Sequence, residues 1–103
     1  MADASKWTST SEQGPDHEAL DVLPRSRGKV AIVTGAGSGI GQATAKRIAA
    51  EAGSVVCVDL FAETAEKTAA DITEAGGTAI GVACDVSSAA DCEATVATAV
   101  ATY

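Results

Sequence analysis

Glycines occupy every second position of the stretch Thr34-Gly35-Ala36-Gly37-Ser38-Gly39-Ile40-Gly41. A continuous apolar run, residues 30–33, comes directly before it and is typical of a parallel strand that is buried on both faces. Residues 40–52, which begin inside the stretch, have the apolar spacing of a helix and precede Gly53, a residue type that often ends helices. The stretch is therefore predicted to be the turn of a strand–turn–helix unit.

Three glycines of this turn have separate physical roles in binding a diphosphate. Gly35 permits backbone angles that other residues avoid, so the turn can be tight. A side chain at Gly39 would obstruct a diphosphate approaching the backbone, and Gly41 lets the helix pack against the strand. The first-turn N–H groups of that helix have no internal partners, and the helix dipole favours an anion there. The turn is therefore predicted to bind a pyrophosphate without a basic side chain.

The alternation of strand and helix continues along the chain. Residues 55–58 and 79–84 are predicted strands and residues 62–75 a second helix, while a third helix starts at a serine cap, Ser87 or Ser88, and runs to Tyr103. This order indicates βαβ units with right-handed crossovers and a parallel sheet. We expect the N-terminal βαβαβα half of a Rossmann-type, doubly wound α/β fold, with spatial strand order 3-2-1. The first strand would then lie at an edge, although its apolar character is that of a central strand.

Apolar spacing also predicts which residues of each helix pack on the sheet. Cys57, Cys84 and Cys92 have no CxxC spacing, so we expect reduced core thiols and no disulfide or zinc site. The expected packing residues are Ile40, Thr44 and Ile48 in the first helix, Ala65, Ala69 and Ile72 in the second, and Cys92, Val96, Val100 and Tyr103 in the third.

An acidic residue follows each of the two later strands. Asp59 comes about 20 residues after the glycines, where its carboxylate could accept hydrogen bonds from both ribose hydroxyls of an adenosine. A 2′-phosphate would be repelled there. Asp85 would face the same crevice and either contact the adenine or order the loop beside it, or else it is a plain turn or cap residue before the third helix.

Composition excludes several classes of partner. The chain has 103 residues with 7 Lys and Arg against 14 Asp and Glu, a formal net charge of -7. Nucleic acids and anionic membrane surfaces need a basic patch, and no run is apolar and long enough to cross a bilayer. The first residues have no apolar secretion segment, so we expect a cytoplasmic protein. We predict a flexible polar tail at residues 1–27 and the N-terminal part of a truncated dinucleotide-binding domain at residues 28–103.

In residues 34–41 the sequence resembles the short-chain dehydrogenase/reductase family, whose glycine motif TGxxxGxG it matches fully. The segment 28–33 and the later Cys84-Asp85-Val86 are also similar to this family, so the resemblance covers about residues 28–103. It implies an oxidoreductase with a Rossmann fold that transfers hydride between a nicotinamide coenzyme and a small alcohol or carbonyl substrate. It also implies that a full-length form is a homo-oligomer.

The resemblance assigns roles to individual residues. The backbone of Ser38, Gly39 and Ile40 would hold the pyrophosphate within the turn that Gly35 and Gly41 shape.

The same resemblance places the adenosine. Asp59 would hold its ribose, while Asp85 and Val86 would lie against the adenine. Members that prefer NADP usually carry a basic residue at the positions that here hold Ser38 and Leu60, so the resemblance favours NAD.

The sequence departs from the family in its catalytic part. The Asn-Asn-Ala-Gly segment, the serine and the Tyr-x-x-x-Lys pair are absent, and Tyr103 is not expected to be catalytic. Family members typically have about 250 residues. We therefore expect a coenzyme-binding portion that is inactive alone. The alternatives are a stand-alone, non-catalytic nucleotide-binding module, and an inactive remnant that aggregates through its open sheet edge.

Overall fold

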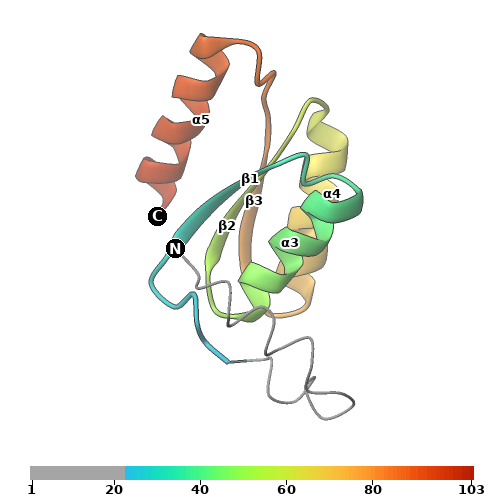
Figure 1. Cartoon of the computed structure of the whole chain (residues 1–103), viewed down its shortest axis with the longest axis vertical. Coiled ribbons are helices and arrows are strands. Elements are labelled where there is room, and N and C mark those ends of the chain that lie inside the picture. The colour runs from blue at the N-terminus through green and yellow to red at the C-terminus, as the bar shows by residue number, and fades with distance from the viewer. Residues whose placement is uncertain (1–22) are drawn as a thin grey trace.

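Three parallel strands alternate with three helices in the computed structural model, which describes residues 23–103 (Figure 1). Residues 1–22 of the predicted tail lie outside the described residues. The strands stand in the order β1-β2-β3, which confirms the predicted βαβαβα Rossmann-type half. The elements are β1 (Val30–Thr34), α3 (Gly39–Ala50), β2 (Ser54–Asp59), α4 (Ala62–Glu74), β3 (Thr78–Ala83) and α5 (Ala89–Thr102).

The central strand β2 divides the core into two layers. Helices α3 and α4 cover one face of the sheet and α5 covers the other (Figure 1). Because side chains alternate along a strand, Val55 and Cys57 face α3 and α4, whereas Val56 and Val58 face the opposite layer. Small side chains complete both layers, so the helices lie close to the sheet. The buried partners are Ala36, Ala45, Ala49, Ala69 and Ile72 in the first layer and Cys84 and Ala99 in the second.

Strand β1 is less buried than the sequence predicts. Its exposure alternates along the strand, and Val30 and Ile32 are 46% and 41% exposed. Within the described residues β1 pairs only with β2 and so lies at the sheet edge. The prediction of a strand buried on both faces is therefore wrong for this part of the chain.

The packing face of α5 also differs from the prediction. Thr95 and Ala99 are its buried residues, and Cys92 packs beside them against the core of that layer. Val96 and Val100, predicted to pack, are 52% and 75% exposed. Smaller side chains three and seven positions after Cys92 let the helix approach the sheet more closely, so the face is rotated from the predicted one.

Of the other two helices, α4 has the predicted packing face and α3 differs from the prediction. In α4 the predicted face is confirmed, because Ala65, Ala69 and Ile72 are buried, and Thr68 is buried with them. In α3 the buried residues are Ala45 and Ala49, whereas Ile40 is 86% exposed. No helix of the described part of the chain is long and apolar enough to cross a membrane.

Candidate functional site

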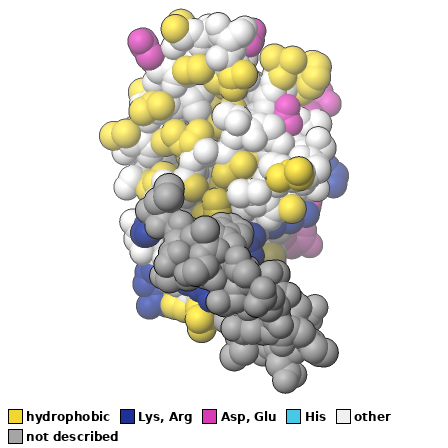
Figure 2. Space-filling model, in the orientation of Figure 1, with side chains coloured by type: hydrophobic (Ala, Val, Ile, Leu, Met, Phe, Trp, Pro, Cys, Tyr) yellow, Lys and Arg dark blue, Asp and Glu magenta, His cyan; other side chains and the backbone are white. Residues whose placement is uncertain are grey.

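A cleft of about 340 Å³ lies at the carboxyl ends of the three strands. The sequence predicts that Asp59 and Asp85 face one crevice, and both line this cleft. Basic side chains visible in Figure 2 lie around and below the middle of the view, away from the loops that follow the strands at the top. The lining residues are Thr34, Gly35, Val58, Asp59, Leu60, Cys84, Asp85 and Val86. A second hollow, between the ends of α3 and α4, contains none of the predicted site residues.

The glycine-rich turn has the backbone geometry that the sequence predicts. Gly35 and Gly39 have φ of 65° and 57°, in the left-handed region that favours glycine. A Cβ on Gly41 would overlap the carbonyl group of Gly35, so this glycine permits the close contact between helix and turn. No atom lies within 4 Å of the place that a Cβ on Gly39 would take. The backbone at Gly39 therefore borders open space, as a site for a diphosphate requires.

The amino end of α3 is open to a ligand. Its N-cap residue is Ser38, whose side chain makes no capping hydrogen bond, and its first turn contains no acidic residue. The first N–H groups of a helix lack partners within the helix, and its dipole adds partial positive charge. This end of α3 therefore has the donors and the electrostatic sign that a pyrophosphate needs.

Two backbone amides orient the carboxylate of Asp59. Its Oδ2 accepts a hydrogen bond from the Gly37 amide at 2.8 Å, and its Oδ1 accepts one from the Leu60 amide at 2.7 Å. Each oxygen of a carboxylate can accept more than one hydrogen bond, so both retain capacity for hydroxyl donors. The side chain is thus held at the end of β2 in a fixed orientation and can still bind a diol.

Gly37 is a site residue that the sequence reasoning missed. A Cβ at this position would overlap Oδ2 of Asp59 and would lie 2.6 Å from the Cβ of Thr64. The signal was present, because Gly37 lies between Gly35 and Gly39, two of the glycines assigned to the turn. Its role depends on the later strand end approaching the turn, which the local pattern does not contain.

Asp85 has features of both of its predicted roles. It lines the cleft, and its Oδ1 accepts hydrogen bonds from the amide and the hydroxyl of Ser87, at 2.9 and 2.6 Å. These hydrogen bonds lower the pKa of Asp85. Its own amide donates to Oδ2 of Asp91 at 3.1 Å, which joins the loop to the first turn of α5. Asp85 is therefore a turn residue that keeps a negative charge at the cleft wall beside the exposed Val86.

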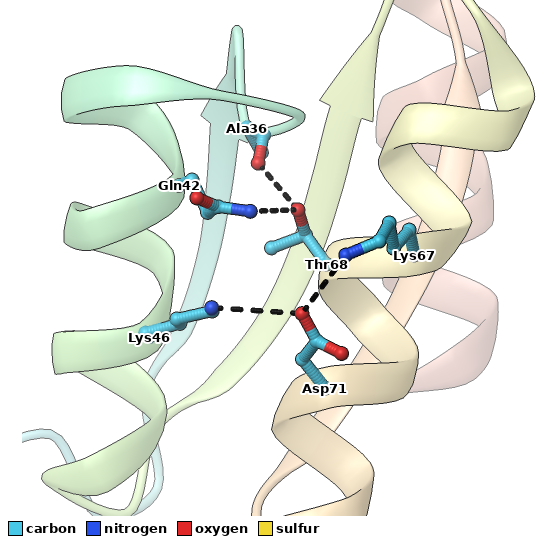
Figure 3. A network of polar contacts seen from close by, with 6 residues as sticks. All are labelled: Ala36, Gln42, Lys46, Lys67, Thr68 and Asp71. Carbon is cyan, nitrogen blue, oxygen red and sulfur yellow. Dashed lines mark hydrogen bonds and ion pairs between the residues drawn. The ribbon is translucent and has the colours of Figure 1, made fainter.

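Thr68 of α4 contacts the glycine-rich turn from behind. Its hydroxyl donates to the Ala36 carbonyl at 2.8 Å and accepts a hydrogen bond from the side-chain amide of Gln42 at 3.4 Å (Figure 3). Sequence reasoning missed Thr68, since a threonine within a helix gives no signal of a contact 32 residues away.

The cysteines lie as predicted for core residues. Cys57 and Cys84 are buried and free, and Cys92 is half-buried and free. Burial raises the pKa of Cys57, which disfavours a reactive thiolate. Within residues 23–103 no group of three or more His, Cys, Asp or Glu side chains could hold a metal ion.

Comparison with known proteins identifies similar chains. The family described as short chain dehydrogenase matches residues 29–103. The short-chain reductase protein NovJ of Streptomyces niveus is 50% identical over 83 residues, which cover 81% of this chain and 32% of NovJ.

Solved structures give the same result. A hydroxysteroid dehydrogenase from Escherichia coli superposes with a TM-score of 0.75 at 36% identity, over 81% of this chain and 34% of that one. A 7α-hydroxysteroid dehydrogenase complexed with NADH and 7-oxo glycochenodeoxycholic acid has a TM-score of 0.73 at 36% identity, over 80% and 32% of the two chains. The chain thus spans about a third of the length of these relatives.

Proposed function

Because the chain belongs to the short-chain dehydrogenase/reductase family, we propose that it is the coenzyme-binding portion of an oxidoreductase that transfers hydride between NAD(H) and an alcohol or carbonyl. One observation carries this proposal. The cleft at the strand ends combines the oriented carboxylate of Asp59 with a neighbouring helix end that has neither a side-chain cap nor an acid in its first turn. A dinucleotide has the matching groups, a ribose diol and a pyrophosphate.

The residues fit the adenosine and pyrophosphate end of the coenzyme. The amides at Ser38, Gly39 and Ile40 would bind the pyrophosphate, with open space over Gly39 to admit it. Asp59 would accept hydrogen bonds from the ribose hydroxyls.

The adenine would lie at the other wall of the cleft, which Leu60, Asp85 and Val86 line. The same residues support NAD over NADP. A 2′-phosphate would lie beside the carboxylate of Asp59, and the residues lining the cleft include no Lys or Arg to neutralise it.

Coenzyme binding and chemistry are divided in this proposal. The nicotinamide supplies hydride transfer when bound, and the residues of this chain hold the adenosine half of the coenzyme. The serine and the Tyr-x-x-x-Lys pair by which the family polarises its substrate do not occur among the 103 residues. The chain alone is therefore expected to bind coenzyme without turning over an alcohol, and the substrate is selected by residues outside it.

Isothermal titration of the chain with NAD, NADP and ADP-ribose tests the proposal. NAD and ADP-ribose should bind, with NADP weaker. Asp59→Asn should weaken the binding of NAD by about tenfold or more, because hydrogen bonds to a charged group contribute about 1.5–3 kcal/mol. It should also reduce the preference of the chain for NAD over NADP. Glu63→Gln, which removes the same charge from an exposed position outside the cleft, should change neither affinity.

Three results would contradict the proposal at different levels. A folded chain that binds neither NAD nor ADP-ribose would exclude coenzyme binding. If Asp59→Asn and Glu63→Gln had the same preference between NAD and NADP, the assignment of Asp59 to the ribose would be wrong. Alcohol oxidation by the chain alone would contradict the proposed division between binding and chemistry.

A further inference from the structure

Thr68 joins three elements through one hydroxyl group. Its side chain is fully buried in α4, and its Oγ1 donates a hydrogen bond of 2.8 Å to the carbonyl oxygen of Ala36 in the glycine-rich turn. The side-chain amide of Gln42, on α3, donates to the same Oγ1 at 3.4 Å (Figure 3). A buried hydroxyl needs partners, and here all of them come from other elements.

Other helical threonines in the described part of the chain use their hydroxyls locally. The hydroxyls of Thr73, Thr95 and Thr98 each donate to the backbone carbonyl four residues earlier in their own helix. Such bonds are common for threonine in helices and place no constraint on another element. Thr68 instead makes a tertiary contact to the turn, so its hydroxyl constrains the position of another segment.

The carbonyl that Thr68 holds belongs to the same peptide unit as the amide that holds Asp59. The Ala36 carbonyl and the Gly37 N–H are the two ends of one planar group, so they rotate together. Thr68 binds the oxygen at 2.8 Å, and Oδ2 of Asp59 accepts from the nitrogen at 2.8 Å. The orientation of this peptide unit therefore links the helix hydroxyl to the carboxylate.

The glycine that follows Ala36 gives this link its importance. The Ala36–Gly37 peptide turns about ψ of Ala36 and φ of Gly37, and a glycine has few restrictions on φ, so without a fixed partner the peptide could rotate at lower cost. The Ala36 amide donates to the Val58 carbonyl at 2.9 Å, which fixes the preceding peptide unit, whereas the Ala36–Gly37 unit is held by its bonds to Thr68 and Asp59.

We propose that Thr68 is a positioning residue that fixes the Ala36–Gly37 peptide and through it directs the carboxylate of Asp59 toward the adenosine ribose of the coenzyme. The ligand part of this inference rests on the proposed function, whereas the peptide link does not. Removal of the hydroxyl leaves the Ala36 carbonyl buried without its partner, so the peptide turns and the Gly37 amide leaves Asp59.

The ligand-free chain offers the first test. The NMR signal of the Gly37 amide and its hydrogen-exchange protection report the bond to Asp59. Thr68→Val and Thr68→Ala should shift that signal and reduce the protection, and Thr68→Ser, which keeps the hydroxyl, should preserve both. Because alanine adds no methyl group to the buried site, overpacking by valine cannot decide the result.

Two control variants separate positioning from general packing. Thr73→Val removes a hydroxyl from the same helix, and its hydroxyl bonds only within α4. Asp71→Asn breaks the ion pair to Lys46, N to O distance 3.5 Å, which joins the same two helices away from the turn (Figure 3). Both controls should leave the Gly37 amide unchanged.

Coenzyme affinity offers the second test. Thr68→Val should raise the Kd for NAD by about tenfold and that for NADP by less, because only NAD gains from a correctly oriented Asp59. In the Asp59→Asn background, Thr68→Val should cause no further loss of NAD affinity. A merely structural threonine would instead weaken both coenzymes equally and add its effect to that of Asp59→Asn.

The outcomes are separable. An unchanged Gly37 amide in both hydroxyl-free variants would overturn the inference, as would an equal change in Asp71→Asn. If the wild-type chain binds no NAD, the proposed function fails, and the ligand-free measurement still decides the link through the peptide.

Discussion

Helices α3 and α5 both follow a strand of the parallel sheet (Figure 1). Their amino ends differ in side-chain capping and in the charge of the first turn. At α5 the hydroxyl of Ser88 accepts a hydrogen bond from the Asp91 amide at 3.2 Å, and Asp91 is also an acidic residue in the first turn. At α3 the side chain of Ser38 makes no capping bond, and the first turn has no acid. The end of α5 is capped by its own residues, whereas that of α3 has neither a side-chain cap nor an acid.

The same residue type stands at both N-caps, and the two ends differ in the third residue of each helix. That residue is Asp91 in α5 and Gly41 in α3. Gly41 packs against the carbonyl group of Gly35, which brings the glycine-rich turn over the helix end. Serine at an N-cap thus caps one helix through its hydroxyl and leaves the amides of the other without a side-chain partner, as the proposed pyrophosphate site requires.

Gly41→Val should have the largest effect, because a branched side chain there would overlap the Gly35 carbonyl group and open the turn. We expect loss of NAD binding and destabilisation by about 1–3 kcal/mol or more, measured by calorimetric titration and urea denaturation. Ala90→Val, the same side chain at an exposed position in the first turn of α5, is the control and should change both by little. Retained NAD binding in Gly41→Val would show that the turn does not need this close contact.

Ser38→Asp should have the second-largest effect, and it should act on binding without lowering stability. Aspartate at an N-cap interacts favourably with the helix dipole, by about 0.3–1 kcal/mol, so the melting temperature should not fall. Its charge would repel the pyrophosphate, and NAD should bind about tenfold more weakly, a change of about 1.4 kcal/mol.

Ser88→Asp is the matched control for this variant. It places the same charge at the amino end of α5, where no ligand is proposed, so NAD affinity should be unchanged. Equal losses of affinity in both variants would indicate a general effect of net charge and would remove the distinction between the two helix ends.

These two helix ends also show what the sequence could predict. The positions of Asp59 and Asp85 at one cleft follow from strand ends and the parallel sheet, and both line it as expected. A serine cap for α5 likewise follows from local pattern, which allowed Ser87 or Ser88, and Ser88 is the cap. Such features depend on residues near one another in the chain or on the repeat of strand and helix.

Features that depend on tertiary approach were not predictable in this way. Gly37 and Thr68 acquire their contacts only when β2 and α4 come against the turn. The buried face of α5 was misplaced for another reason. Alanine, valine and threonine occur on every side of this helix, so apolar spacing does not distinguish Thr95 and Ala99 from Val96 and Val100. Close packing then selects the smaller residues.

Ser88→Ala should have a smaller effect and should act on stability alone. Loss of the bond to the Asp91 amide should lower the free energy of unfolding by about 1 kcal/mol, with NAD affinity unchanged. Ser38→Ala should lower the free energy of unfolding by less, because the side chain of Ser38 makes no capping bond. Urea denaturation of the two variants compares them directly, and equal losses would mean that the two ends are capped alike.

The smallest expected effect concerns the charge of Asp85 beside the end of α5. The amide and hydroxyl of Ser87 lower its pKa, so Ser87→Ala, which removes the hydroxyl bond, should raise that pKa toward its ordinary value. Because the pKa is lowered in the folded chain, this bond stabilises the fold above the unfolded pKa, and the stabilisation is lost as the pH falls through the folded pKa.

An NMR titration of the Asp85 carboxyl carbon measures this shift, with Ser88→Ala as the control because its hydroxyl bonds to the Asp91 amide and not to Asp85. The difference in stability between wild type and Ser87→Ala should be present at neutral pH and should shrink below about pH 4, where the carboxyl gains its proton. A constant difference down to acid pH would assign the effect of Ser87 to the loop backbone. The negative charge of Asp85 beside the end of α5 would then be independent of this hydroxyl.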